Sequence, residues 1–228
     1  MAESVQVTQS VVAAESGPPA AAPKEYAGLD RVKFFSDAVF AIAITLLILN
    51  VVLPHVSKQS DLAHDLGAIW PKYGAFAFTF LLIGLRWMTH VTQFRYIRAY
   101  DFTILGLNLA LLFVVAFLPF ASKVLADYPD SRPACILYAA SMVVAGLIST
   151  WLWYHAYHKT SLIDPNLDPY LKMNFLLRWA ALPVFFVVAI ILVIFVPDLW
   201  WARTAAFATV LVQIAITAWA KRKGHPIM

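Results

Sequence analysis

Five polar side chains stand inside otherwise apolar stretches of this sequence, where unpaired polar groups are costly. They are Asp37, Arg86, His90, Gln93 and Asn108. Arg86, His90 and Gln93 follow one another at i, i+4 and i+7, a spacing that places them on one face of a helix. A carboxylate in apolar surroundings needs a cation or hydrogen-bond donors within reach, so the other four residues are the natural partners of Asp37. The pattern favours a structural network that joins helices over a proton relay.

Other residues that could bind a metal ion or take part in chemistry are weaker candidates. Asp61, His64 and Asp65 share a helical face that would suit a metal ion, although a solvated loop face is the simpler interpretation. His155 and His158 stand among Trp and Tyr residues, which favours an interfacial aromatic belt over a metal site. The sequence contains no phosphate-binding glycine-rich loop, no His-Glu-x-x-His motif and no nucleophile elbow. We therefore expect no enzyme activity, no catalytic residue, no metal site and no cofactor.

The composition indicates what kind of structure must hold these residues. Of 228 residues, 61% are hydrophobic and 13% are charged, and the mean hydropathy is +0.73. A soluble domain carries about 25% charged residues, so this chain has too little polar surface to cover a globule. The single cysteine, Cys135, excludes an intramolecular disulfide and a cysteine-based zinc site. The net charge of +4 comes from residues at the ends of apolar runs, which is typical of a membrane protein and not of a nucleic-acid-binding surface.

Six apolar runs predict an all-α, integral membrane bundle of six transmembrane helices. A spanning helix needs about 20 apolar residues, and each run reaches that length with its flanks. Alternation with a period of two, typical of barrel strands, is absent. The expected helices cover residues 31–54, 69–98, 101–125, 133–158, 172–197 and 199–221. Residues 1–28 are expected to be a disordered cytosolic tail, residues 29–223 the six-helix transmembrane domain, and residues 224–228 a short C-terminal tail.

The distribution of basic residues predicts the orientation. With the N-terminus inside, twelve of the seventeen Lys and Arg residues fall on the inner side. The outer side then holds Lys58, Lys72, Lys123, Arg132 and Arg203. The positive-inside rule therefore places both termini in the cytoplasm. The chain shows no internal repeat, so a pore would more naturally be formed by several copies.

The first predicted helix carries two faces that serve different surfaces. At about 100° per residue, Thr45, Leu46 and Leu49 lie within about 60° of Ile42, whereas Asp37 lies about 140° away. One face is expected to meet copies of the chain and the other the bundle of the same subunit. By itself, an apolar stripe of this kind is also typical of lipid-facing or core surface.

Two blocks of residues in the first three helices resemble a known family. Arg31 is followed four residues later by Phe35-Ser36-Asp37. The second block comprises Trp87, His90, Phe94, Ile97, Asp101, Leu105, Asn108 and Leu118-Pro119-Phe120. Together they resemble the transmembrane protein 175 family of potassium channels in its short prokaryotic form, while the last three predicted helices match by hydropathy alone.

The resemblance implies a homotetramer in which the first helices surround a central axis. Apolar rings would constrict the pore at Ile42, Leu46 and Leu49, and a hydroxyl ring linked to cation selectivity would fall at Thr45. The signature residues would hold the first helix against its neighbours; they are Arg31, Phe35, Ser36 and Asp37, acting through Trp87, His90 and Asn108. The implied protein is a leak-like channel of the cell membrane that passes K+ in preference to Na+. Its partners would be other copies of itself and the lipid bilayer, with no nucleic acid.

Two other classes of function remain open at this stage. A secondary transporter would need charged groups near the bilayer midplane in discontinuous helices, whereas the charges here lie nearer the inner boundary. A non-conducting scaffold or auxiliary subunit would have the same composition. The number of copies in the assembly distinguishes a channel from these classes, because a single six-helix chain cannot surround a central axis.

Overall fold

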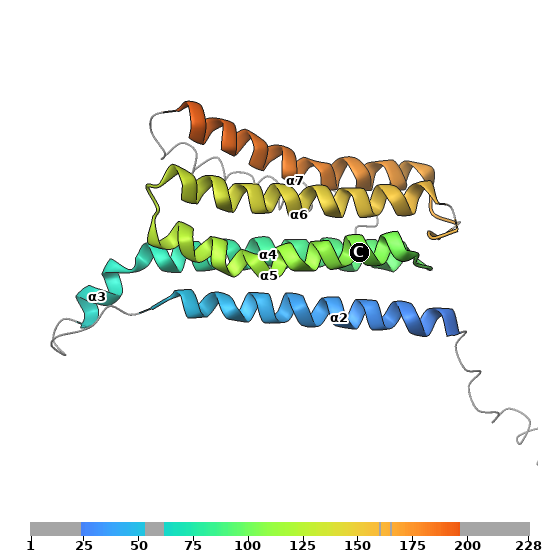
Figure 1. Cartoon of the computed structure of the whole chain (residues 1–228), viewed down its shortest axis with the longest axis horizontal. Coiled ribbons are helices and arrows are strands. Elements are labelled where there is room, and N and C mark those ends of the chain that lie inside the picture. The colour runs from blue at the N-terminus through green and yellow to red at the C-terminus, as the bar shows by residue number, and fades with distance from the viewer. Residues whose placement is uncertain (1–23, 53–61, 160, 165, 197–228) are drawn as a thin grey trace, which may run out of the picture.

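The computed structural model describes residues 24–52, 62–159, 161–164 and 166–196. In this part of the chain the structure is helical, apart from connections and one isolated bridge between Ile97 and Ile163 (Figure 1). The elements are α2 (Lys24–Leu46), the 3-10 turn η1 (Leu47–Asn50), α3 (Leu62–Ala68), α4 (Trp70–Tyr96), α5 (Phe102–Asp127), α6 (Arg132–His158) and α7 (Pro169–Phe195). The prediction of an all-α structure is confirmed.

Five of the described helices are long and apolar enough to cross a membrane. These spans are Gly28–Asn50, Trp70–Tyr96, Phe102–Asp127, Arg132–His158 and Met173–Phe195. The helix expected at 199–221 and the terminal tails beyond residues 24 and 196 lie outside the described residues. α2 begins at Lys24, before both the predicted helix start at 31 and the predicted end of the tail at 28. The helix therefore begins four residues before its apolar span, which starts at Gly28.

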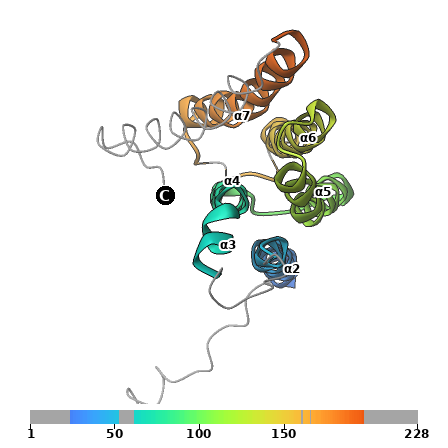
Figure 2. The same ribbon diagram turned by 90° about the vertical axis from the view of Figure 1, so that its left-hand side faces the viewer.

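The helices are arranged so that α2 lies at one side of the bundle and α7 at the other (Figure 2). α2 packs against α4 and α5, α5 packs against α6, and α6 packs against α7. Phe40 and Ala43 of α2 and Leu47 of η1 are buried in this contact. Because neighbours cover only one side of α2, its opposite side faces away from its own subunit.

A hydroxyl cluster joins three helices in the interior. The Thr79 hydroxyl on α4 lies 2.9 Å from the Ser122 hydroxyl on α5 and 3.1 Å from the Tyr138 hydroxyl on α6. All three side chains are buried. A hydroxyl in apolar surroundings is stable only when it is hydrogen-bonded, so the cluster fixes the relative register of these helices.

A close contact between α6 and α7 depends on a glycine. A Cβ atom built on Gly146 would lie 2.8 Å from Cδ and 2.9 Å from Cβ of Pro183. Pro183 lies within α7, and Figure 1 shows α7 changing direction near its middle, as is typical of a proline inside a helix. Gly146 therefore provides the space into which the proline ring packs.

Substitution of Gly146 by alanine is expected to destabilise the bundle. The proline ring is rigid, so α7 must move away from α6, at a cost of about 1–3 kcal/mol of unfolding free energy. Gly106→Ala is the matched control, because a Cβ there meets no described atom within 4 Å. Thermal unfolding in detergent measures both variants, and equal midpoints for the two would contradict this packing account.

Candidate functional site

The outward side of α2 carries a continuous apolar stripe. Ile42 is 59% exposed, Leu46 42% and Leu49 68%, although all three lie within a membrane span. Thr45 is also exposed and lies on the same side. Neighbouring Phe40, in contrast, is almost fully buried. The structure thus places the four predicted stripe residues together on a surface that their own subunit does not cover.

Thr45 is the hydroxyl-bearing member of this stripe. Its Oγ1 donates a hydrogen bond to the carbonyl oxygen of Ile42 at 2.9 Å. The hydroxyl proton is therefore engaged within the helix, and the oxygen lone pairs remain available on the exposed side. Such an oxygen is a suitable ligand for a partly dehydrated cation.

The stripe ends at an anchored turn. From Leu47 to Asn50 the helix tightens to a 3-10 turn, in which residues three apart lie in line. Leu46 and Leu49 are therefore stacked along the helix axis. The Asn50 side-chain nitrogen donates to the carbonyl oxygen of Pro119 in α5 at 2.9 Å, which fixes the end of α2 to its neighbour. Asn50 is not predictable from the sequence as an anchor, since a single amide at the end of an apolar run carries no distinctive spacing.

Behind the stripe, a chain of hydrogen bonds joins α2, α5 and α4. Asn108 donates from Nδ2 to the Ser36 hydroxyl at 3.0 Å, and its Oδ1 lies 2.9 Å from Nε2 of His90. All three side chains are buried. Ser36 in turn donates to the carbonyl oxygen of Val32 at 2.8 Å. This network holds the first helix in a fixed rotation, so that Ser36 faces the bundle.

Asp37 contacts Trp87, one of the partners that the family resemblance implies, and not the partners expected on the basis of charge. Nε1 of Trp87 donates to Asp37 Oδ1 at 2.8 Å. Neither Arg86 nor Gln93 forms a hydrogen bond or ion pair with it in the described part of the chain. The expectation that these two polar residues pair with Asp37 is wrong, because their side of α4 is turned towards other helices.

Gln93 and Arg86 have separate surroundings. Gln93 Nε2 donates to the Ser149 carbonyl oxygen at 3.0 Å and lies 3.1 Å from the Ser149 hydroxyl. The Arg86 side chain is buried beside Trp179 and Leu182 of α7. Among the described residues no group hydrogen-bonds its Nη2. The two polar residues therefore belong to the contacts of α4 with α6 and α7.

The other two signature residues do not join this network. Arg31 is exposed and Phe35 is 56% exposed. Both lie on the same side of α2 as the apolar stripe. Within one subunit, neither of these side chains is buried in the described structure.

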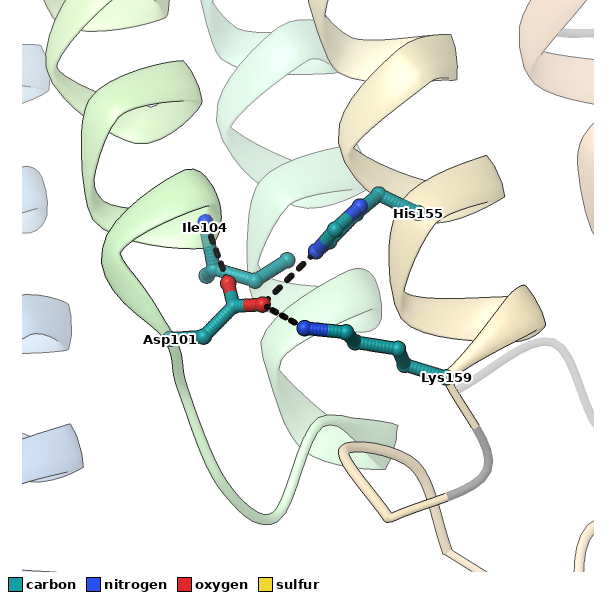
Figure 3. A network of polar contacts seen from close by, with 4 residues as sticks. All are labelled: Asp101, Ile104, His155 and Lys159. Atoms are coloured by element: carbon teal, nitrogen blue, oxygen red, sulfur yellow. Dashed lines mark hydrogen bonds and ion pairs between the residues drawn. The ribbon is translucent and has the colours of Figure 1, made fainter.

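A second polar network joins the ends of α5 and α6 (Figure 3). Asp101 caps α5 by accepting from the Ile104 amide at 2.9 Å. Its Oδ2 lies 2.8 Å from His155 Nε2 and accepts from Lys159 Nζ at 2.9 Å. Partial desolvation raises the pKa of the Asp101 carboxyl, but the bonds from His155, Ile104 and Lys159 outweigh it and hold that pKa below its usual range. The aromatic residues around His155 predict an interfacial belt and give no sign of this contact, which depends on two helix ends meeting in space.

Loss of the Asp101 carboxylate is expected to destabilise this end of the bundle. Asp101→Ala removes a helix cap and its ion pairs, which costs about 1–2 kcal/mol at neutral pH. The Asp101 carboxyl has a lower pKa in the folded state than in the unfolded state. Its contribution to the unfolding free energy is therefore full above the unfolded-state pKa and is lost as the pH falls through the folded-state pKa. The difference between wild type and variant should therefore narrow below about pH 4. Chemical unfolding at several pH values tests this, and a difference that does not depend on pH would contradict it.

The weaker candidates occupy ordinary structural positions. His64 Nδ1 lies 3.5 Å from Asp65 Oδ1, and His64 is highly exposed; Asp61 lies outside the described residues. The ring of His158 contacts those of Tyr154 and Tyr157. Within the described ranges, no group of three or more His, Cys, Asp or Glu side chains is placed to hold a metal ion.

These features define a class of protein. The chain is a multi-pass α-helical membrane protein whose first helix presents an apolar, hydroxyl-bearing face outside its own bundle. A family model described as the endosomal/lysosomal potassium channel TMEM175 matches residues 31–119. The chain belongs to the TMEM175 family, as its signature residues predicted.

Individual relatives agree with this assignment. The chain is 42% identical over 142 residues to a potassium channel of Streptomyces collinus, covering 60% of this chain and 69% of that protein. It is 34% identical over 143 residues to a potassium channel of Chamaesiphon minutus, covering 60% and 70%. The fold matches the crystal structure of a Chamaesiphon minutus homologue of the lysosomal potassium-selective channel TMEM175, with a TM-score of 0.73. The two sequences are 27% identical, and the match covers 83% of this chain and 97% of that one.

Proposed function

We propose that this chain forms a potassium-permeable, leak-like channel of the cell membrane, built from four copies around a central axis. The observation that carries the proposal is the α2 stripe of Ile42, Leu46 and Leu49, which is exposed in the subunit yet lies in a membrane span. Four copies of that stripe, facing one another, would form successive apolar rings. The bacterial relatives named as potassium channels support the choice of ion.

Selectivity in this proposal comes from partial dehydration. An ion crossing an apolar ring loses part of its water shell, and K+ is more weakly hydrated than Na+, so its barrier is lower. Narrow apolar rings also control conduction by dewetting. Ile42 would then act as gate and filter, while the exposed Thr45 oxygen replaces some of the lost water. Arg31 and Phe35, exposed on the same side of α2, would contact neighbouring copies.

The proposed orientation follows from the charge distribution. With both termini in the cytoplasm, the end of the bundle where α2 begins and α4 ends lies on the inner side. Most Lys and Arg residues of the chain fall on that side, as the positive-inside rule requires.

Flux measurements on purified protein in liposomes, together with its stoichiometry in detergent, test the proposal. A channel predicts passive K+ flux that exceeds Na+ flux and a tetramer. Uptake of K+ against its own gradient, driven by a second ion, would instead indicate a secondary transporter. A tetramer that passes neither ion would indicate a scaffold.

A further inference from the structure

A cavity with charged side chains in its lining lies between α2 and α4, apart from the stripe. Its volume is about 200 Å³, and it is lined by Lys33, Asp37, His90, Val91, Phe94 and Arg95. Around the axis of α2, Lys33 and Asp37 lie about 180° and 140° from Ile42. The cavity therefore opens on the side of α2 that faces away from the proposed pore.

The cavity lies near the ends of two helices that are long and apolar enough to cross a membrane. Arg95 is in the last turn of α4, which ends at Tyr96, and Lys33 is near the beginning of the apolar span of α2. Both helix ends lie at the same end of the bundle (Figure 1). Basic pockets between transmembrane helices at this depth are typical binding sites for lipid head groups.

The cations of the cavity are available to an anion. Arg95 forms no hydrogen bond or ion pair with another described residue. Lys33 Nζ lies 3.3 Å from Asp30 Oδ1 in an exposed pair, which leaves two of its three N–H donors free. Guanidinium groups bind phosphate oxygens with two parallel hydrogen bonds, so the two side chains suit a phosphate.

The cavity also contains an acceptor. Oδ1 of Asp37 is engaged by Trp87, and no described residue hydrogen-bonds its second carboxylate oxygen. His90 does not compete for that oxygen through Nε2, which is engaged by Asn108. A ligand that fits must therefore combine a phosphate with a nearby N–H or O–H donor.

We propose that this cavity binds the head group of a phospholipid, with the phosphate at Lys33 and Arg95 and the terminal amine or hydroxyl at Asp37. Phosphatidylethanolamine and phosphatidylglycerol satisfy both requirements. Phosphatidylcholine has the phosphate, but its quaternary nitrogen carries no N–H donor. The lipid therefore binds by its head group, with its acyl chains along the outside of the bundle.

Native mass spectrometry of the delipidated full chain, titrated with each lipid, tests this site. Phosphatidylethanolamine and phosphatidylglycerol should bind about tenfold more tightly than phosphatidylcholine, the difference expected for one charge-assisted hydrogen bond. The double variant Lys33→Gln/Arg95→Gln should lose the preferred lipids. Lys123→Gln/Arg132→Gln, which removes two basic side chains at the opposite end of the bundle, should bind them as wild type does.

Equal binding of the three lipids by wild type would overturn the proposal, and that result needs no variant. Wild-type binding by a double variant with unchanged helical content would also overturn it. Displacement of the lipid by millimolar inorganic phosphate would show a free-anion site instead. Because binding is measured without ion flux, failure here is separate from failure of the channel proposal.

Discussion

Replacing Ile42 by asparagine is expected to remove most of the discrimination between K+ and Na+. In the proposed tetramer the change places four amides at the apolar ring, where they substitute for the water that each ion must lose. The free-energy cost of dehydration then falls more for Na+ than for K+. We expect the ratio of K+ to Na+ flux to fall to about 1 and total flux to rise about tenfold, which corresponds to a barrier lower by about 1.4 kcal/mol.

Ile48→Asn is the matched control for this experiment. Ile48 is 54% exposed, close to the 59% of Ile42, and it is turned about 100° away from Ile42 around the helix axis. Flux and selectivity of this variant should resemble those of wild type. Equal changes in the two variants would mean that exposure to lipid, and not position at a pore, determines the effect.

Replacing Asn108 by leucine is expected to have the largest effect on stability. The substitution removes both hydrogen bonds of the amide and leaves the buried Ser36 hydroxyl and His90 imidazole without that partner. Loss of the partner of the buried His90 imidazole costs about 1–3 kcal/mol. Loss of one hydrogen bond at Ser36, which still donates to the Val32 carbonyl oxygen, costs about 0.5–1.5 kcal/mol. The unfolding free energy should therefore fall by about 2–4 kcal/mol. α2 would also lose the contact that fixes its rotation, and with it the alignment of the apolar stripe.

Thermal unfolding in detergent and the fraction of assembled protein measure this effect. Asn174→Leu is the control, because Asn174 is an exposed amide of α7. The control should unfold at the wild-type temperature. Near-identical midpoints for the two variants would show that the Ser36–Asn108–His90 chain does not hold α2.

Much of the fold follows from hydropathy and helical periodicity. The runs around α4, α5 and α6 predict spans that agree with the structure to within a few residues, because a bilayer allows few alternatives to a helix. The same arithmetic places Ile42, Leu46 and Leu49 on one side of α2. Hydropathy does not show which side of a helix is covered by its own subunit. That depends on helix packing, which the structure shows.

The polar contacts were less predictable. Asp37 binds the indole of Trp87 although formal charge favours Arg86, since the rotation of α4 decides which neighbour is in reach. The contact between Asp101 and His155 links residues far apart in the sequence. It depends on the lengths of α5 and α6 and on the connection between them, which no local pattern encodes.

Cysteine modification of the α2 stripe tests the central claim most directly. Cys135 is the sole native cysteine, so a Cys135→Ser background carries only the thiol that is introduced. In that background, a soluble cationic thiol reagent should block K+ flux through Thr45→Cys, because the modified side chain would occupy the pore. Flux through Ile48→Cys should continue after the same treatment. Complete modification of Thr45→Cys with unchanged K+ flux would contradict a pore lined by α2.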